Sequence, residues 1–136
     1  MIKNMFFDVM GVVFTVGDDT NDLLVPFVQK FNNDISQQQI CEFYLEASLG
    51  KITAREFWLN MGVEESKIKL IEEKYLDENL KIDSEIVDTI KLLKERKYKI
   101  GFLSNDVSEW GSYLRKKFNL DYLLDFCIIS GDVKLR

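Results

Sequence analysis

Two short segments of the sequence end an apolar run with polar side chains that can do chemistry. Asp8 follows the first run, and Gly11 comes three residues later, where a residue without a side chain lets the backbone turn sharply. Ser104 and Asn105 follow a second apolar run. A carboxylate can act as a nucleophile, and a hydroxyl beside an amide can hydrogen-bond an anionic oxygen.

Each segment also has a purely structural interpretation. Asp8 can cap the loop that follows a strand, and Ser104 with Asn105 can form a turn that caps a helix beginning at Ser108. On residue types alone, the Ser-Asn pair favours the turn. A third segment, residues 130–136, is a polar, basic tail after another apolar run and indicates little by itself.

The composition limits the classes of function. The chain has 136 residues, enough for one domain or for a small core with a cap, and 46% of them are apolar. It has no histidine, which excludes Ser-His-Asp and Cys-His triads and His-ligated zinc and leaves catalysis to carboxylates. The net charge of -5 disfavours nucleic acid or an anionic membrane as a partner.

The sequence also predicts a cytoplasmic protein. Cys41 and Cys127 have no metal-binding spacing, and we expect both to be reduced packing residues. The apolar start is interrupted by Asp8 and lacks a small-residue cleavage site, so we expect no export. No apolar run reaches the roughly 18 residues that a membrane-spanning helix needs.

The order of elements predicts an α/β fold. Residues 2–9, 99–103 and 126–129 are short apolar runs typical of buried parallel strands, whereas 84–97 and 108–118 have helical periodicity. Strands that alternate with helices indicate a doubly wound sheet, with right-handed crossovers between parallel strands.

A helical block interrupts this alternation. Four helices are expected between the first strand and residue 80, without a strand signal, which favours a cap (18–80) inserted into a core formed by 1–17 and 81–136. Pro26 either lies near the start of the first of these helices or kinks it. The expected helices are 21–31, 36–49 with Ser36 as its cap, one opened by a Thr53–Glu56 capping box, and 64–79; Ser84 is expected to cap the core helix that follows.

Taken together, these segments resemble the haloacid dehalogenase (HAD) superfamily, specifically its members with a helical cap after the first strand. The Asp-x-x-Gly-Val element that begins at Asp8 resembles the first family motif, and Leu103-Ser104-Asn105 resembles the second. The stretch 50–58 resembles one common in these caps. The likeness covers nearly all of the chain and implies a Rossmann-like core, of which three parallel strands are present.

The resemblance implies a hydrolase, namely a Mg²⁺-dependent phosphatase of a small phosphorylated metabolite that works through an aspartyl-phosphate intermediate. Asp8 would be the nucleophile, and its carboxylate would hold the Mg²⁺ together with the backbone carbonyl of Met10. Amides near Gly11, the Ser104 hydroxyl and the Asn105 amide would bind the phosphoryl oxygens.

The sequence departs from the family pattern at two places. Phosphatases of the family usually carry a second Asp two residues after the nucleophile as general acid and base, where this chain has Met10. The third motif, a Lys, and the fourth, an acidic pair, have no counterpart up to Arg136, and Lys134 is the nearby substitute. We therefore expect the present chain to be inactive or impaired by truncation.

Two alternatives remain open. A haloacid-type dehalogenase uses the same nucleophile without a metal; Met10 fits that class, but its usual early-cap Arg is missing, since no Arg occurs between Asp8 and Arg55. The other alternative is a non-catalytic fragment that self-associates. Without later strands, residues 2–9 would form an exposed sheet edge, through which the chain could form a homodimer.

Overall fold

The computed structural model describes residues 3–14 and 17–136. Its sheet has three parallel strands in the order β1 (Asn4–Asp8), β2 (Lys99–Ser104) and β3 (Phe126–Ile129), which confirms the predicted α/β class. In the register of the sheet, Asp8 lies beside Leu103, so the carboxyl ends of β1 and β2 coincide.

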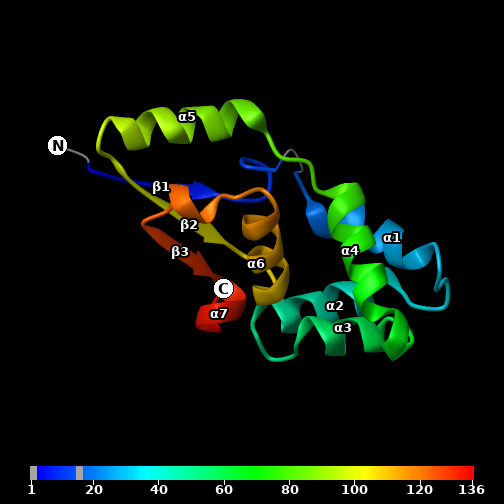
Figure 1. Cartoon of the computed structure of the whole chain (residues 1–136). Helices are drawn as coiled ribbons and strands as arrows, with labels where there is room; N and C mark the ends of the chain where they lie inside the picture. The colour runs from blue at the N-terminus through cyan, green and yellow to red at the C-terminus, as the bar shows by residue number, and fades with distance from the viewer. Residues whose placement is uncertain (1–2, 15–16) are drawn as a thin grey trace.

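The helices α1–α4 gather at one end of the molecule, beside the carboxyl ends of the strands, whereas α5 runs along the sheet (Figure 1). In chain order the helical elements are a π-helical segment (Thr20–Leu24), α1 (Val25–Gln29), α2 (Gln37–Ser48), α3 (Ala54–Asn60), a 3-10 turn (Glu65–Lys67), α4 (Ile68–Asn79), α5 (Ser84–Glu95), α6 (Ser108–Lys117), a second 3-10 turn (Asp121–Leu123) and α7 (Ser130–Val133).

Side-chain caps decide where several of these helices begin. Ser36 caps α2 as predicted, and Thr53 forms the predicted capping box with Glu56. Ser36 also forms a capping box, with Gln39; in both boxes the hydroxyl accepts a hydrogen bond from the N–H of the third helical residue. The prediction of Ser84 as the cap of α5 is wrong, because the carboxylate of Asp83 accepts from two amides of the first turn, at 2.9 and 3.2 Å. Ser84 is instead the first helical residue.

The first predicted helix, 21–31, is not a single α-helix. It begins with the π-helical turn, and α1 follows with Pro26 in its first turn. Proline has no N–H to donate, so it fits a first turn, where no intrahelical donor is required. Asp18 stabilises the beginning of the segment, because its carboxylate accepts from the Asn21 backbone N–H at 2.9 Å.

The two faces of the sheet differ in burial. Ile100 and Phe102 point into the core and are fully buried, whereas Phe6 and Leu103 on the other face are 53% and 54% exposed. Parallel sheets usually bury both faces. The described part of the chain covers one face, and β1 lies at an edge of its sheet.

The helical block contacts the sheet-bearing part through α6. Glu72 on α4 accepts hydrogen bonds from the indole N–H groups of Trp58 on α3, at 2.9 Å, and Trp110 on α6, at 2.8 Å. The two chain connections between these parts also lie together, since the Asp83 N–H donates to the Val13 carbonyl at 2.8 Å. The assignment of 18–80 as a cap stays an interpretation of this arrangement.

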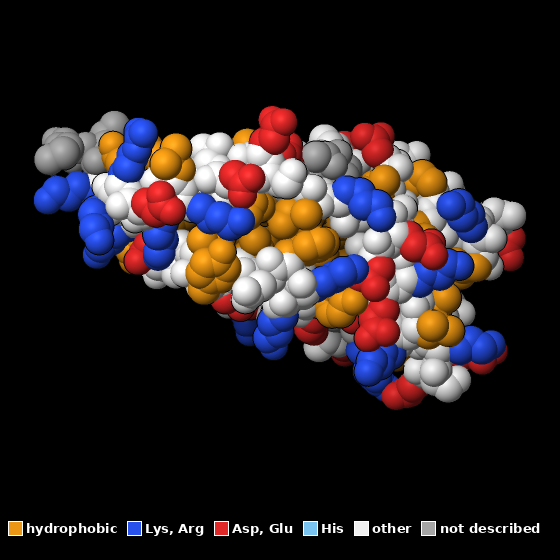
Figure 2. All heavy atoms as spheres, turned by 45° about the horizontal axis from the view of Figure 1, so that its top comes forward, with side chains coloured by type: hydrophobic (Ala, Val, Ile, Leu, Met, Phe, Trp, Pro, Cys, Tyr) orange, Lys and Arg blue, Asp and Glu red, His pale blue; other side chains and the backbone are white. Residues whose placement is uncertain are grey.

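The face that carries α5 shows Lys and Arg side chains interspersed with Asp and Glu, rather than a broad field of one sign (Figure 2). Within the described ranges, no helix combines the length and the apolar character that crossing a bilayer requires.

Candidate functional site

Asp8 is held at the carboxyl end of β1 by the tight turn that follows it. The turn closes through hydrogen bonds from the Val13 and Phe14 N–H groups to the Val9 carbonyl, at 2.9 and 3.0 Å. Gly11 has a φ of +79°, a conformation that residues with a side chain rarely adopt. The Asp8 carboxylate accepts a hydrogen bond from the Val9 N–H at 2.8 Å, so Asp8 does cap the start of the loop, as its structural interpretation predicted. Its side chain is nevertheless exposed.

Ser104 and Asn105 end β2 next to Asp8. The Ser104 side chain is buried, and its hydroxyl is one of the side-chain groups without a hydrogen-bond partner among the described residues. Neither residue caps α6. The Asp106 carboxyl instead accepts from the Val107 N–H at 2.7 Å, just before that helix begins. The prediction that Ser104 and Asn105 cap the helix beginning at Ser108 is therefore wrong.

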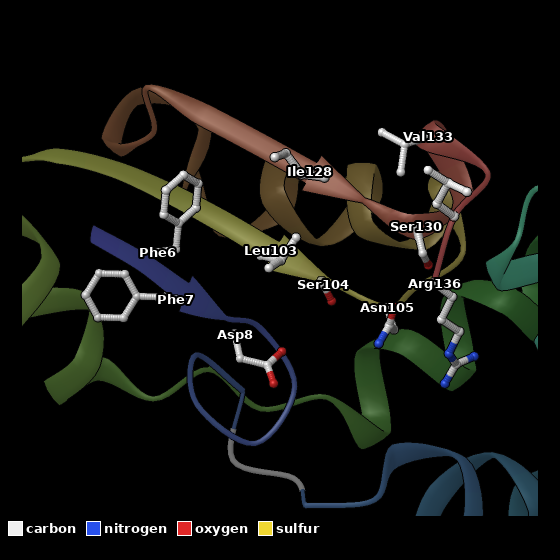
Figure 3. A pocket seen from close by; sticks show the side chains of 11 residues that line it. Phe6, Phe7, Asp8, Leu103, Ser104, Asn105, Ile128, Ser130, Val133 and Arg136 are labelled. Atoms are coloured by element: carbon white, nitrogen blue, oxygen red, sulfur yellow. The ribbon is translucent and has the colours of Figure 1, made fainter. Parts of the chain in front are cut away.

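Asp8, Ser104 and Asn105 line one pocket of about 600 Å³ (Figure 3). They converge because the carboxyl ends of adjacent parallel strands meet at the same edge of the sheet. The other lining residues are mostly apolar side chains of the open sheet face and residues of the tail, namely Phe6, Phe7, Leu103, Ile128, Ser130, Val133, Leu135 and Arg136.

Met10 and Gly11, which follow Asp8 in the turn, are not among the lining residues. The Gly11 N–H donates to the Phe14 carbonyl at 2.9 Å, because the turn folds back on itself, and so it is not free for a ligand. The structure thus brings together three of the five residues assigned to the site and leaves the other two in the supporting turn.

The oxygen atoms near Asp8 suit a Mg²⁺ ion that is also bound by water or by a substrate. The Asp8 carboxylate and the Met10 carbonyl are oxygen donors, which Mg²⁺ prefers. Within the described residues, no group of three or more His, Cys, Asp or Glu side chains can hold a metal. Mg²⁺ commonly binds through one or two carboxylates while it keeps waters and substrate oxygens, so the residues present fit that mode.

Asp106 is a buried carboxyl group near the pocket that the sequence did not predict. Asp106 is almost fully buried, and its burial, followed by the nearby charge of Asp19, raises its pKa to about 8. Burial likewise raises the pKa of Asp19. Asp106 follows a predicted site residue, but nothing in the sequence indicates its burial, which depends on residues remote in the chain. It holds its proton at neutral pH.

Arg136 was also missed as a pocket residue. After α7, Lys134 adopts a left-handed φ of +58°, and the tail turns so that Arg136 lines the pocket. Its guanidinium donates to the Ser48 hydroxyl at 2.7 Å and lies over the Tyr44 ring, 5.7 Å from the centroid. Lys134 packs near Gly50 and is absent from the lining, which gives no support to its role as a substitute for the family's lysine.

Comparison with solved structures identifies the fold of the chain. No family model matches the chain, and no curated protein matches it. A HAD family enzyme from Bacteroides thetaiotaomicron has a TM-score of 0.78 at 20% identity, over 98% of this chain and 71% of that one. Its wild-type complex with magnesium and inorganic phosphate gives 0.75 at 20% identity, over 100% and 72%.

The name of a second neighbour indicates a different reaction. The L-2-haloacid dehalogenase from Xanthobacter autotrophicus has a TM-score of 0.59 at 18% identity, over 99% of this chain and 59% of that one. Both likenesses extend over nearly the whole of this chain. The chain therefore has the fold of the HAD family enzymes.

Proposed function

We propose that the chain carries the nucleophile and the phosphate-binding groups of a HAD-type hydrolase that acts on a small phosphate ester with Mg²⁺. The observation that carries this proposal is the pairing of Asp8 with Ser104 in one pocket, where the buried Ser104 hydroxyl has no partner among the described residues. An unsatisfied buried hydroxyl costs free energy, and a phosphoryl oxygen would satisfy it.

In the proposed reaction, one Asp8 carboxylate oxygen attacks phosphorus, and the bond from phosphorus to the ester oxygen breaks. The leaving alkoxide takes a proton from water, because Met10 has none to give. Water then attacks the aspartyl phosphate, which releases phosphate and regenerates the carboxylate. The Ser104 hydroxyl and the Asn105 amide donate hydrogen bonds to the phosphoryl oxygens, and bound Mg²⁺ supplies charge neutralisation.

Hydrolysis of p-nitrophenyl phosphate tests this proposal. The protein to use is a longer form that supplies the lysine and the acidic pair of the third and fourth motifs, assayed with and without Mg²⁺. Asp8→Asn should abolish turnover, since an amide is not a nucleophile. Asp34→Asn, the same change at an exposed loop position, should leave it intact. Full activity of the Asp8→Asn protein would refute the assignment.

Phosphate binding tests the second group separately. Ser104→Ala should weaken binding of inorganic phosphate by roughly tenfold, the effect of losing one hydrogen bond to a charged group. Isothermal titration calorimetry measures this affinity, with Ser66→Ala at an exposed position as the control. If Ser104→Ala binds inorganic phosphate with unchanged affinity, the Ser-Asn pair has only a structural role.

A haloacid-type dehalogenase is the second candidate. Met10 suits a reaction without a general acid, and Arg136 supplies the pocket with an arginine that the early part of the helical block lacks. Asp8 would then attack carbon and expel halide, and water would release the product from the ester. Chloride release from 2-chloropropionate without Mg²⁺, lost in Asp8→Asn, would favour this candidate over the phosphatase.

A further inference from the structure

Arg136 lies across the pocket from Asp8. Figure 3 shows Ser104 and Asn105 between the two side chains, with the arginine on the side of the helical block. Asp8 ends β1, whereas Arg136 comes from the tail after β3, two strands away in the sheet.

The guanidinium of Arg136 is held in position by α2. It donates to the Ser48 hydroxyl at 2.7 Å, and it stacks on the ring of Tyr44, which is itself buried. A side chain fixed before a ligand arrives loses less conformational entropy on binding. Arg136 is exposed, but these two contacts hold its guanidinium in place, so it is a preorganised binding group.

The positive charge of Arg136 is not neutralised by an ion pair. None of the salt bridges between described residues includes it. The neighbouring carboxyl of Asp106 is neutral at pH 7, because burial raises its pKa to about 8. A guanidinium carries five N–H donors, and the bond to Ser48 uses one of them. The remaining donors form a fork that matches a carboxylate in a bidentate pair.

We propose that Arg136 binds a carboxylate of the substrate, so that the substrate is a phosphate ester of a small carboxylic acid. This inference rests on the proposed function, because it takes the phosphoryl group to lie at Asp8, Ser104 and Asn105. The carboxylate then lies at the opposite end of the pocket. The exposed side chains of Leu103 and Ile128 line the same pocket on the open face of the sheet.

Two phosphonates with carbon chains of the same length test the proposal in the 136-residue chain with Mg²⁺. Phosphonopropionate ends in a carboxylate, whereas propylphosphonate ends in a methyl group. Calorimetry should show that the chain binds phosphonopropionate at least about tenfold more tightly, as expected for one bidentate charged pair. Arg136→Gln should remove this preference and leave the affinity for propylphosphonate unchanged, and Arg136→Lys should restore part of it.

Controls separate this inference from the proposed function. Lys134→Gln removes a neighbouring cation outside the pocket lining and should keep the preference. Ser104→Ala should weaken both ligands equally. Equal affinity of the unchanged chain for the two ligands would overturn the inference alone, as would an equal loss of both in Arg136→Gln. Failure of both ligands to bind would overturn the inference and the proposed phosphate site together.

Discussion

The hydroxyl of Ser130, on α7, donates a hydrogen bond of 2.5 Å to the backbone carbonyl of Ser48, at the end of α2. The same hydroxyl accepts from the backbone N–H of Asp106 at 3.0 Å. One small side chain thus joins the helical block, the segment after β2 and the segment after β3. All three residues are buried, so water does not compete for these bonds. This junction lies directly behind the pocket.

Ser130→Ala should lower the free energy of unfolding by about 1–3 kcal/mol, because it leaves a buried N–H and a buried carbonyl without their partner. Urea denaturation followed by tryptophan fluorescence measures this change. Ser66→Ala, at an exposed position, is the matched control and should lie within about 0.5 kcal/mol of the parent. Equal stability of Ser130→Ala and the parent would show that the junction is not energetically important.

Asp106 should make stability depend on pH. Its pKa is raised from 3.8 to about 8 in the folded chain, so between these values the folded state keeps a proton that the unfolded state releases. The free energy of unfolding contributed by this group is therefore full below pH 3.8, falls as the pH rises, and levels off above about pH 8.

Asp106→Asn should flatten this decline, because an amide does not titrate and its oxygen can still accept from the Val107 N–H. Urea midpoints of the parent and the variant at pH 5 and pH 8 would measure the difference. Asp34→Asn, at an exposed position, should follow the parent at both values. Parallel pH profiles for the parent and Asp106→Asn would contradict the raised pKa.

The 136-residue chain itself should show little or no hydrolysis of p-nitrophenyl phosphate. No lysine lines the pocket among the described residues, and they contain no metal-binding cluster of acidic side chains. Catalytic groups that act as a unit lose their effect together when some are missing. Nitrophenolate release by protein of verified mass is the measurement, and robust Mg²⁺-dependent turnover would show that the described pocket residues suffice for catalysis.

Most of the fold was predictable because local signals agreed with the tertiary structure. The short apolar runs gave the three strands, and the hydroxyl caps at Ser36 and Thr53 gave helix starts to the residue. The errors were local. The π-helical turn before Pro26 and the cap at Asp83 depend on which of several neighbouring residues forms a hydrogen bond with the backbone. The sequence does not indicate which of these residues forms it.

The site was predictable only in part. Asp8 and Ser104 end apolar strands, and the parallel topology brings such ends together. Arg136 and Asp106 carry no comparable signal. The position of Arg136 depends on a left-handed residue in the tail and on contacts with α2, whereas the burial of Asp106 depends on packing against remote elements. Long-range packing of this kind leaves no periodic pattern in the sequence.

Self-association through β1 remains a prediction, and the structure sharpens its test. β1 lies at an edge of the described sheet, and its outward Phe6 stacks on Phe126, with ring centroids 6.1 Å apart, on the open apolar face. Antiparallel pairing of two β1 edges about a two-fold axis places the two Phe6 side chains together on one face and extends the sheet across both copies.

We therefore expect light scattering of the freshly purified chain to show a dimer or a larger assembly. Phe6→Lys should reduce association, because it places a charge on the exposed edge. Leu70→Lys, at a similarly exposed apolar position on α4, should not reduce it. Circular dichroism would establish that both variants are folded. A stable monomer across micromolar concentrations would contradict the prediction, as would equal effects of the two substitutions, since these would indicate association through general surface hydrophobicity rather than through β1.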